Sequence, residues 1–322
     1  MKGWTGQVPR ILVVGWGFLG AAIGMSLSDH GVDVCGLTRS ETSRTHAAHL
    51  RGIHISIGDA GNQKTIESSM RGVDHVVYVA GGLDPPSAAL RPLEDAVGTL
   101  SPLLATLETT RSFDHVSLTY ISSGGAVYGN PIHTLATEAD IPRPVSSYGV
   151  SRFAGEVYSQ MYAATFGITA QIVRCANVYG PGQSHARPQG AVAVFLHRIA
   201  AGLTISVVGN GRSVRDYVYI ADVTTALARL VLDRVDCGVV NLGSGVGHTV
   251  TELLAVVSNT VGRAPVVEFA PRRSHDVDAI VLDISKLRSL IPYEPTALED
   301  GVRATWERLG AEEGLDTEAG FL

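Results

Sequence analysis

Runs of apolar residues alternate with amphipathic segments along the first two-thirds of the chain. Short apolar runs bounded by glycine or polar residues are typical of strands buried in a parallel sheet. The intervening segments have the apolar spacing of helices that cover such a sheet. The alternation predicts an α/β fold of the Rossmann type, a doubly wound parallel sheet whose ligands bind at the carboxyl ends of the strands. The predicted strands are 10–15, 32–38, 53–59, 73–82, 113–125 and 168–180, and the predicted helices include 18–31, 64–72, 91–111 and 147–165.

The pattern becomes less regular after Pro181. A polar loop with glycine and proline (182–190) precedes a predicted helix (191–202) and then a strand, a turn and a strand (207–223). We expect a smaller C-terminal lobe here, with some of its strands rejoining the first sheet. The predicted division is a Rossmann domain over 1–180, a part that is mainly the smaller lobe over 181–310, and a frayed acidic tail over 311–322.

Composition narrows the class of protein. Of the 322 residues, 45% are hydrophobic and 17% are charged, which is typical of a globular chain. The net charge of −6 argues against a nucleic-acid-binding protein, which would normally be basic. Three widely spaced cysteines favour buried thiols over disulfides or a metal site. The apolar stretch 11–27 resembles a signal peptide, but its three glycines fit a nucleotide loop better, so we expect a cytoplasmic protein without membrane or metal.

A glycine-rich turn joins the first predicted strand to the first predicted helix. Gly15, Gly17 and Gly20 form a G-x-G-x-x-G motif. Glycine allows a tight turn and a close approach of the backbone to a pyrophosphate, and the helix N-terminus supplies free N–H groups. The motif is specific for dinucleotide binding only in this context, with a strand before it and a helix after it. It predicts dinucleotide binding by Gly15, Gly17, Phe18, Leu19 and Gly20.

The end of the second predicted strand favours one dinucleotide over the other. An acidic side chain there would bind the 2′-hydroxyl of NAD, whereas a hydroxyl and a cation suit the 2′-phosphate of NADP. Thr38, Arg39 and Ser40 stand at this position, with Arg44 nearby. These residues predict NADP as the cofactor, with NAD as the alternative.

A further motif, SSYGVSRFAGE at 146–156, carries candidate catalytic residues. Tyr148 precedes Arg152 by four residues, so the two side chains share one face of a helix. A nearby cation favours the phenolate form of a tyrosine, which makes Tyr148 a candidate acid/base group. Arginine is unexpected here, because it keeps its proton at any working pH and cannot join a proton relay as a lysine might.

Seven motifs occur in an order that gives the chain a family likeness. They are GFLG at 17–20, GDA at 58–60, ISSGGAVYG at 121–129, SSYGVSRFAGE at 146–156, RCANVYGPGQ at 174–183, RDYVYIADV at 215–223 and RRSHDVD at 272–278. From Ile11 to about Gly301 the chain resembles the extended short-chain dehydrogenases/reductases, specifically their NAD(P)-dependent nucleotide-sugar epimerase/dehydratase family. The resemblance implies hydride transfer at a sugar carbon of a nucleotide-sugar substrate.

The resemblance also implies roles for individual residues. Tyr148 would be the acid/base, and Arg152 would hold the nicotinamide ribose. Arg215 and Arg273 would neutralise the substrate pyrophosphate, because planar guanidinium groups bind phosphate oxygens in pairs. The other implied residues are Asp59, Ala60, Ala80 and Gly81 near the cofactor, and Ser123, Asn177 and Asp276 near the substrate.

Four departures from the family pattern bear on the chemistry. Val14 stands where the glycine loop usually has an extra glycine, and Asp95 stands where an asparagine is common. Gly124 occupies the position of the serine or threonine that assists the tyrosine, so we predict Ser123 as a catalytic substitute. Arg152 replaces a lysine. The loop after Ser123 also lacks the acid pair that a dehydratase of this family needs, which argues against dehydration.

Three functions remain open. The motifs at 121–129 and 146–156 resemble those of UDP-glucose 4-epimerases and favour hydride transfer at C4 of a UDP- or dTDP-hexose. The NADP-like strand end favours an NADPH-dependent 4-keto-sugar reductase. Loss of both the lysine and the loop hydroxyl leaves a catalytically impaired cofactor- or sugar-nucleotide-binding protein as a third alternative. The resemblance also implies a homodimer, formed through the helices at 91–111 and 147–165.

Overall fold

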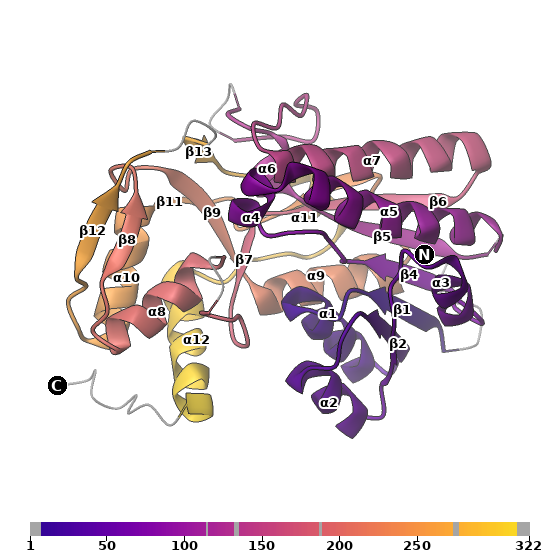
Figure 1. Cartoon of the computed structure of the whole chain (residues 1–322), viewed down its shortest axis with the longest axis horizontal. Helices are drawn as coiled ribbons and strands as arrows, with labels where there is room; N and C mark the ends of the chain where they lie inside the picture. Colours follow the sequence, from indigo (N-terminus) through magenta and orange to yellow (C-terminus); the bar gives the residue numbers. More distant parts are fainter. Residues whose placement is uncertain (1–7, 114, 132–134, 187–188, 273–276, 314–322) are drawn as a thin grey trace.

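A parallel sheet of seven strands runs through the larger part of the molecule (Figure 1). The structure is a computed structural model that describes residues 8–113, 115–131, 135–186, 189–272 and 277–313. From one edge of the sheet to the other, the strands are β10 (Val239–Leu242), β6 (Thr169–Cys175), β5 (Ser117–Ser123), β4 (His75–Tyr78), β1 (Arg10–Val14), β2 (Asp33–Thr38) and β3 (His54–Ile57). The chain builds outward from β1 to β3 and then crosses back to β4, and this reversal of strand order marks the ligand-binding edge of such folds.

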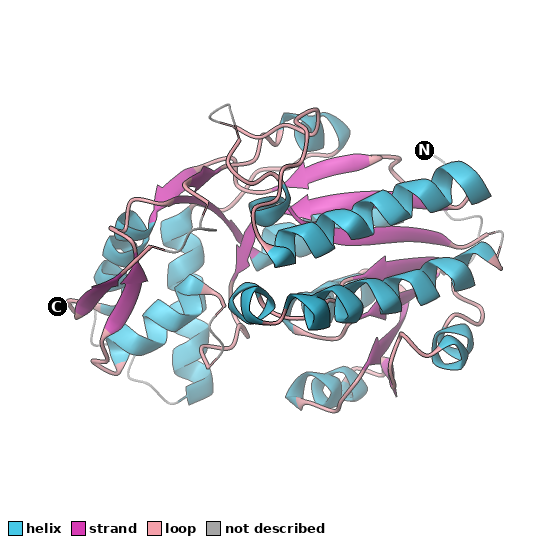
Figure 2. Cartoon of the chain, turned by 45° about the horizontal axis from the view of Figure 1, so that its top comes forward, coloured by secondary structure: helices cyan, strands magenta, loops and turns pink. Residues whose placement is uncertain are grey.

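Helices cover both faces of this sheet (Figure 2). The alternation along β1 explains the two layers, because Ile11 and Val13 belong to one hydrophobic cluster while Leu12 and Val14 belong to the other. On the first face lie α1 (Phe18–Asp29), α2 (Ser43–Leu50), α9 (Ile220–Leu232) and α11 (Ser285–Leu290), and on the second lie α3 (Gln63–Ser69), α4 (Pro85–Leu90), α5 (Pro92–Arg111) and α7 (Ser147–Phe166). The predicted Rossmann-type architecture is confirmed.

A smaller part of the molecule has its own hydrophobic cluster, which includes Leu196, Leu253 and Val302. Each of these residues comes from a different helix, so the three helices share one core. The helices are α8 (Ala191–Ala200), α10 (Val250–Val261) and α12 (Leu298–Glu313). The strands are β8 (Ile205–Val208) paired with β12 (Val267–Ala270), and β9 (Val214–Tyr219) paired with β7 (Asn177–Tyr179), β11 (Gly247–Thr249) and β13 (Ala279–Ile280).

The chain after residue 180 contributes to both parts. Strand β10 pairs in parallel with β6 in the large sheet, and α9 packs against α1. Elements after residue 180 therefore belong to both parts of the fold, as the sequence predicted for some of the later strands. The functional division at residue 180 stays a prediction. No described helix is long and apolar enough to span a membrane.

One sequence prediction is wrong, and the end of another moves. The single strand predicted at 168–180 divides at Ala176, because β6 continues the large sheet while β7 pairs with β9. The strand, turn and strand predicted over 207–223 are observed as β8 and β9, but β8 pairs with β12 and the residues from Ile220 onward form α9. Most of the tail predicted to fray over 311–322 lies outside the described residues, which end with α12 at Glu313, so this stays a prediction.

Candidate active site

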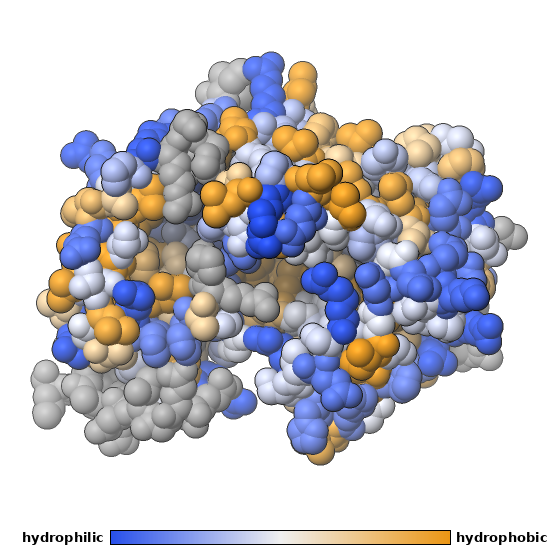
Figure 3. All heavy atoms as spheres, viewed as in Figure 1, coloured by the Kyte–Doolittle hydropathy of each residue, from blue (hydrophilic) through white to orange (hydrophobic). Residues whose placement is uncertain are grey.

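A cleft of about 1370 Å³ lies at the carboxyl ends of the large sheet, where the smaller part adjoins it. Figure 3 shows the surface hollowed near the middle of this face. Two predicted residues, Arg273 and Asp276, lie outside the residues that the structure describes. All the other predicted site residues line the cleft: Gly15, Gly17, Phe18, Leu19, Gly20, Thr38, Arg39, Ser40, Asp59, Ala60, Ala80, Gly81, Ser123, Tyr148, Arg152, Asn177 and Arg215.

The glycine loop has the geometry of a cradle that side chains would fill. Gly15 has φ +101°, and a Cβ there would lie 2.6 Å from the backbone nitrogen of Ala80. A Cβ on Gly20 would lie 1.9 Å from the carbonyl oxygen of Gly15. Gly17 caps α1 without a side-chain hydrogen bond and faces open space, so the helix N-terminus is exposed to the cleft. A pyrophosphate fits such a cradle because the backbone N–H groups can approach it closely.

Trp16 is a part of this loop that sequence reasoning did not select. Its side chain is only 2% exposed. A Cβ on Gly24 would lie 2.2 Å from the Trp16 ring, and a Cβ on Gly36 would lie 2.5 Å from it. The indole therefore occupies a slot between α1 and β2 that only these two glycines leave open, and nothing local to the motif reveals that slot.

The end of β2 presents polar side chains to the cleft. Thr38 is half-buried, whereas Arg39 and Ser40 are exposed. Arg39 makes no hydrogen bond or ion pair with any other described residue. Asp59, at the end of β3, accepts a hydrogen bond from the Gly61 nitrogen at 2.8 Å and faces the same region. The guanidinium of Arg39 and the neighbouring hydroxyls of Thr38 and Ser40 can together bind a phosphate monoester.

Tyr148 lies in the first turn of α7. The Ser146 hydroxyl caps this helix by accepting a hydrogen bond from the Gly149 nitrogen at 3.1 Å. The cap fixes where the helix begins, and so where the phenol enters the cleft. One turn later, the guanidinium carbon of Arg152 lies 5.1 Å from the centre of the Tyr148 ring. The predicted pairing of phenol and cation on one helix face is present.

Arg152 is only 9% exposed and is held against the loop that follows β4. Its Nη1 donates to the Ala80 carbonyl at 3.3 Å, and its Nε is buried without a partner among the described residues. A Cβ on Gly81 would lie 1.8 Å from Nη2, so the guanidinium depends on glycine at that position. Burial lowers the pKa of Arg152. The neighbouring Tyr148 and Tyr120 raise this pKa by more than burial lowers it, so the net shift is upward. Arg152 therefore stays a fixed cation.

Of the two neighbouring serines, Ser122 and Ser123, only Ser123 is not hydrogen-bonded through its side chain within the described residues. The neighbouring Ser122 is buried and donates to Glu156 at 2.5 Å. Ser123 lines the cleft and makes no side-chain hydrogen bond with other described residues. A Cβ on Gly124 would lie 2.6 Å from Cδ1 of Leu282, so a buried leucine fills the space where a hydroxyl-bearing side chain would stand. The geometry leaves Ser123 as the available hydroxyl.

A buried polar network lies behind this loop. Arg174 and Glu156 form an ion pair at 2.7 Å, with exposed side-chain fractions of 4% and 1%. Arg174 also donates to the Tyr128 hydroxyl at 2.9 Å, and that hydroxyl donates to Asn241 at 2.7 Å. The network joins β5, α7, β6 and β10, so it holds the floor of the site in one arrangement.

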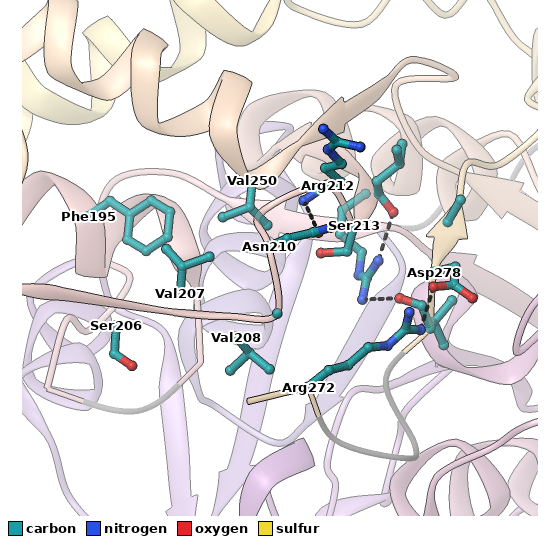
Figure 4. A pocket seen from close by; sticks show the side chains of 15 residues that line it. Phe195, Ser206, Val207, Val208, Asn210, Arg212, Ser213, Val250, Arg272 and Asp278 are labelled. Carbon is teal, nitrogen blue, oxygen red and sulfur yellow. Dashed lines mark hydrogen bonds and ion pairs between the residues drawn. The ribbon is translucent and has the colours of Figure 1, made fainter. Parts of the chain in front are cut away.

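The smaller part supplies the other end of the cleft. Asn177 donates to the Asp216 carbonyl at 3.1 Å, and Arg215 donates at 2.8 Å to the carbonyls of Val214 and Val277. A second cavity of about 480 Å³ adjoins the cleft at Arg215 (Figure 4). Its lining includes Arg212 and Arg272, two arginines that the sequence predicted to be bystanders, and Arg272 forms an ion pair with Asp278. This region is cationic in a protein whose net charge is negative.

Comparisons with known proteins identify the family of the chain. A UDP-glucose 4-epimerase of Mycolicibacterium smegmatis is 30% identical over 92% of this chain and 97% of that protein. A dTDP-4-dehydro-6-deoxy-D-allose reductase of a Streptomyces species is 26% identical over 95% of this chain and 98% of that protein. The crystal structure of UDP-glucose 4-epimerase from Thermus thermophilus, in complex with NAD, matches with a TM-score of 0.85 and 32% identity, covering 93% of this chain and 98% of that one. Residues 11–243 match the sequence model of the NAD dependent epimerase/dehydratase family, and the chain belongs to that family.

Proposed function

We propose that the protein is an NAD(P)-dependent nucleotide-sugar 4-epimerase that acts on a UDP- or dTDP-hexose. The observation that carries the proposal is that one cleft contains the glycine loop, Tyr148, Ser123 and Arg215. These groups suit a dinucleotide, a sugar and a nucleoside diphosphate bound together. Relatives of both the epimerase and the reductase kind align over almost the whole chain.

The residues of the cleft divide the chemistry between them. The glycine loop fits a dinucleotide, and when bound the nicotinamide would accept a hydride from the sugar carbon and return it. Tyr148 would take the proton from the sugar hydroxyl as the ketone forms, and give it back on reduction. Ser123 would donate a hydrogen bond to the same oxygen. Arg152, whose guanidinium carbon lies 5.1 Å from the centre of the Tyr148 ring, would supply a fixed positive charge beside this phenol.

An NADPH-dependent 4-keto-sugar reductase is the second candidate. The exposed Arg39, together with Thr38 and Ser40, favours it, since these groups suit the 2′-phosphate of NADP. A reductase must exchange its cofactor at every turnover, whereas an epimerase keeps it.

Purified protein distinguishes the candidates. Interconversion of UDP-hexoses or dTDP-hexoses without added dinucleotide supports the epimerase. Oxidation of added NADPH with a nucleotide 4-keto-sugar supports the reductase. Binding of dinucleotide and nucleotide sugar with neither reaction identifies a catalytically impaired binding protein and overturns both.

The outer faces of α5 and α7 support a homodimer. Val97, Val150, Val157, Tyr158 and Met161 are apolar side chains exposed on these neighbouring helices. We propose that a second copy covers them, and the elution mass of the purified protein tests this. The buried free thiols fit a reducing compartment, so we also propose a cytoplasmic location, which cell fractionation tests.

A further inference from the structure

One arginine reaches across the mouth of the cleft. Arg44, in the first turn of α2, donates through Nη2 to the carbonyl of Gly182 at 2.6 Å. Gly182 comes 138 residues later and lies in the loop between β7 and α8. Arg44 in α2 lines the cleft, and so do Gln183 and Ser184, which follow Gly182 in the loop after β7. The hydrogen bond therefore joins the Rossmann sheet side of the cleft to the side that leads into the smaller part.

The Arg44 end of this contact is fixed by its surroundings. Thr42 caps α2 in a capping box with Thr45, which sets the direction of the helix. The indole of Trp16 donates to the Arg44 carbonyl at 3.4 Å. Because Trp16 is buried beneath the glycine loop, the backbone of Arg44 is tied to the residues that cradle the dinucleotide pyrophosphate.

The Gly182 end is also part of a defined turn. Gly182 has φ +80°, in the left-handed region that favours glycine. The Gln183 nitrogen donates to the Gly180 carbonyl at 3.3 Å, and the Gln183 side chain donates to the Val178 carbonyl at 3.1 Å. These bonds attach the turn to β7, so its carbonyl is presented from a supported position.

We propose that this contact, the Arg44–Gly182 clasp, retains the dinucleotide in the cleft. The inference rests on the proposed function, because it assumes a dinucleotide on the glycine loop with its adenosine end at Thr38, Arg39 and Ser40. A molecule so placed lies between the walls that the clasp joins, and it leaves only when the clasp opens. Slow release suits an epimerase, whose cofactor must stay bound between the two half-reactions.

The experiment compares the release of prebound NADH and NADPH from wild type and from R44M, followed by dinucleotide fluorescence in stopped flow. Methionine keeps much of the side-chain length and removes the donor. A bond between a charged donor and an exposed carbonyl predicts roughly tenfold faster release for both dinucleotides, with an unchanged association rate. The matched control is R51M, which removes an exposed arginine from the other end of α2 that pairs with Asp29. Its release rates should equal those of wild type.

Three outcomes overturn the clasp. Release from R44M at the wild-type rate shows that the contact does not retain the ligand. Faster release of NADPH alone shows that Arg44 binds the 2′-phosphate instead. A slower association rate with unchanged release shows that Arg44 only attracts the anion. Wild type is measured first: if it binds neither dinucleotide, the proposed function itself fails, and this failure is distinct from the other three.

Discussion

Two arginines are buried beside β5, and their surroundings differ. Arg174 is 4% exposed, and its guanidinium bonds both oxygens of Glu156 and the Tyr128 hydroxyl. Arg152 is 9% exposed, and its neighbours are the Ala80 carbonyl at 3.3 Å and the Tyr120 hydroxyl, with no carboxylate partner among the described residues and an Nε without any partner. The protein supplies the charge of Arg174 with a carboxylate partner, but it supplies none for Arg152 among the described residues.

The contrast indicates which region is built for folding and which for a ligand. A buried cation that has no carboxylate partner and leaves one N–H without an acceptor destabilises the folded chain. Arg152 lines the cleft beside Tyr148, where a bound cofactor would supply the missing acceptor oxygens. Arg174 lies behind the cleft and needs nothing from outside the protein. Four predictions test this contrast, from the largest expected effect to the smallest.

Removing the charge of Glu156 should affect stability most. In E156Q the buried Arg174 loses its ion-pair partner, and the free energy of unfolding should fall by about 3–5 kcal/mol in urea denaturation. R152M is the matched control, one turn earlier on α7. Without ligand it should change stability by no more than about 1 kcal/mol, because it removes a cation that the protein leaves unpaired. An equal loss of unfolding free energy in E156Q and R152M would contradict the distinction between the two arginines.

Removing the Tyr148 hydroxyl should affect turnover most. Y148F should lower kcat roughly a thousandfold, because the acid/base group is gone, while the dinucleotide Kd stays within about threefold of wild type. Turnover of the identified nucleotide sugar and fluorescence titration measure the two quantities. Full activity of Y148F on that substrate would contradict the assignment.

His75 is a third buried titratable group, and its neutral imidazole finds hydrogen-bond partners within the protein. Its ring nitrogens meet the hydroxyls of Ser117 and Thr119 at 2.6 and 2.9 Å. Burial, helped by Arg234, lowers the pKa of His75 from 6.5 to about 3. The unfolded chain therefore binds a proton more readily, so this contribution to stability is present above about pH 6.5 and is lost as the pH falls towards 3. We expect a loss of about 2 kcal/mol between pH 7 and pH 5, measured by urea denaturation.

The control for that loss is H75Q, which cannot titrate. Its stability should change less between pH 7 and pH 5 than that of wild type. An equal change in the two proteins would assign the pH dependence to other groups.

The smallest effect concerns the fit between Arg152 and Gly81. G81A should weaken dinucleotide binding and lower kcat/KM roughly tenfold, because the new methyl group displaces the guanidinium. R152K should also lower kcat/KM, since the site is shaped for arginine. The double variant R152K/G81A should lose less than the product of the two single losses. Strictly multiplicative losses, or a faster R152K enzyme, would show that arginine is not matched to Gly81.

The fold was predictable because its signals are local. Short apolar runs, amphipathic helices and the glycine loop each lie within a few residues, and the predicted order of strands and helices in the first 180 residues is largely observed. The prediction of one strand over 168–180 was wrong because the choice of partner strand decides the structure there. Nothing within 168–180 reveals that β7 leaves the large sheet for β9, and nothing within 207–223 reveals that β8 pairs with β12. Pairing over such distances depends on the whole assembled sheet.

The sequence by itself determined the glycine cradle, the face shared by Tyr148 and Arg152, and the set of residues expected at one edge of the sheet, because strand and helix periodicity fix these. Only the tertiary structure decided that Leu282 fills the space beside Gly124, that Glu156 neutralises Arg174, and that Arg44 reaches Gly182. Each of these contacts joins residues that are distant in the chain. Their energies depend on packing and burial, which exist only once the chain has folded.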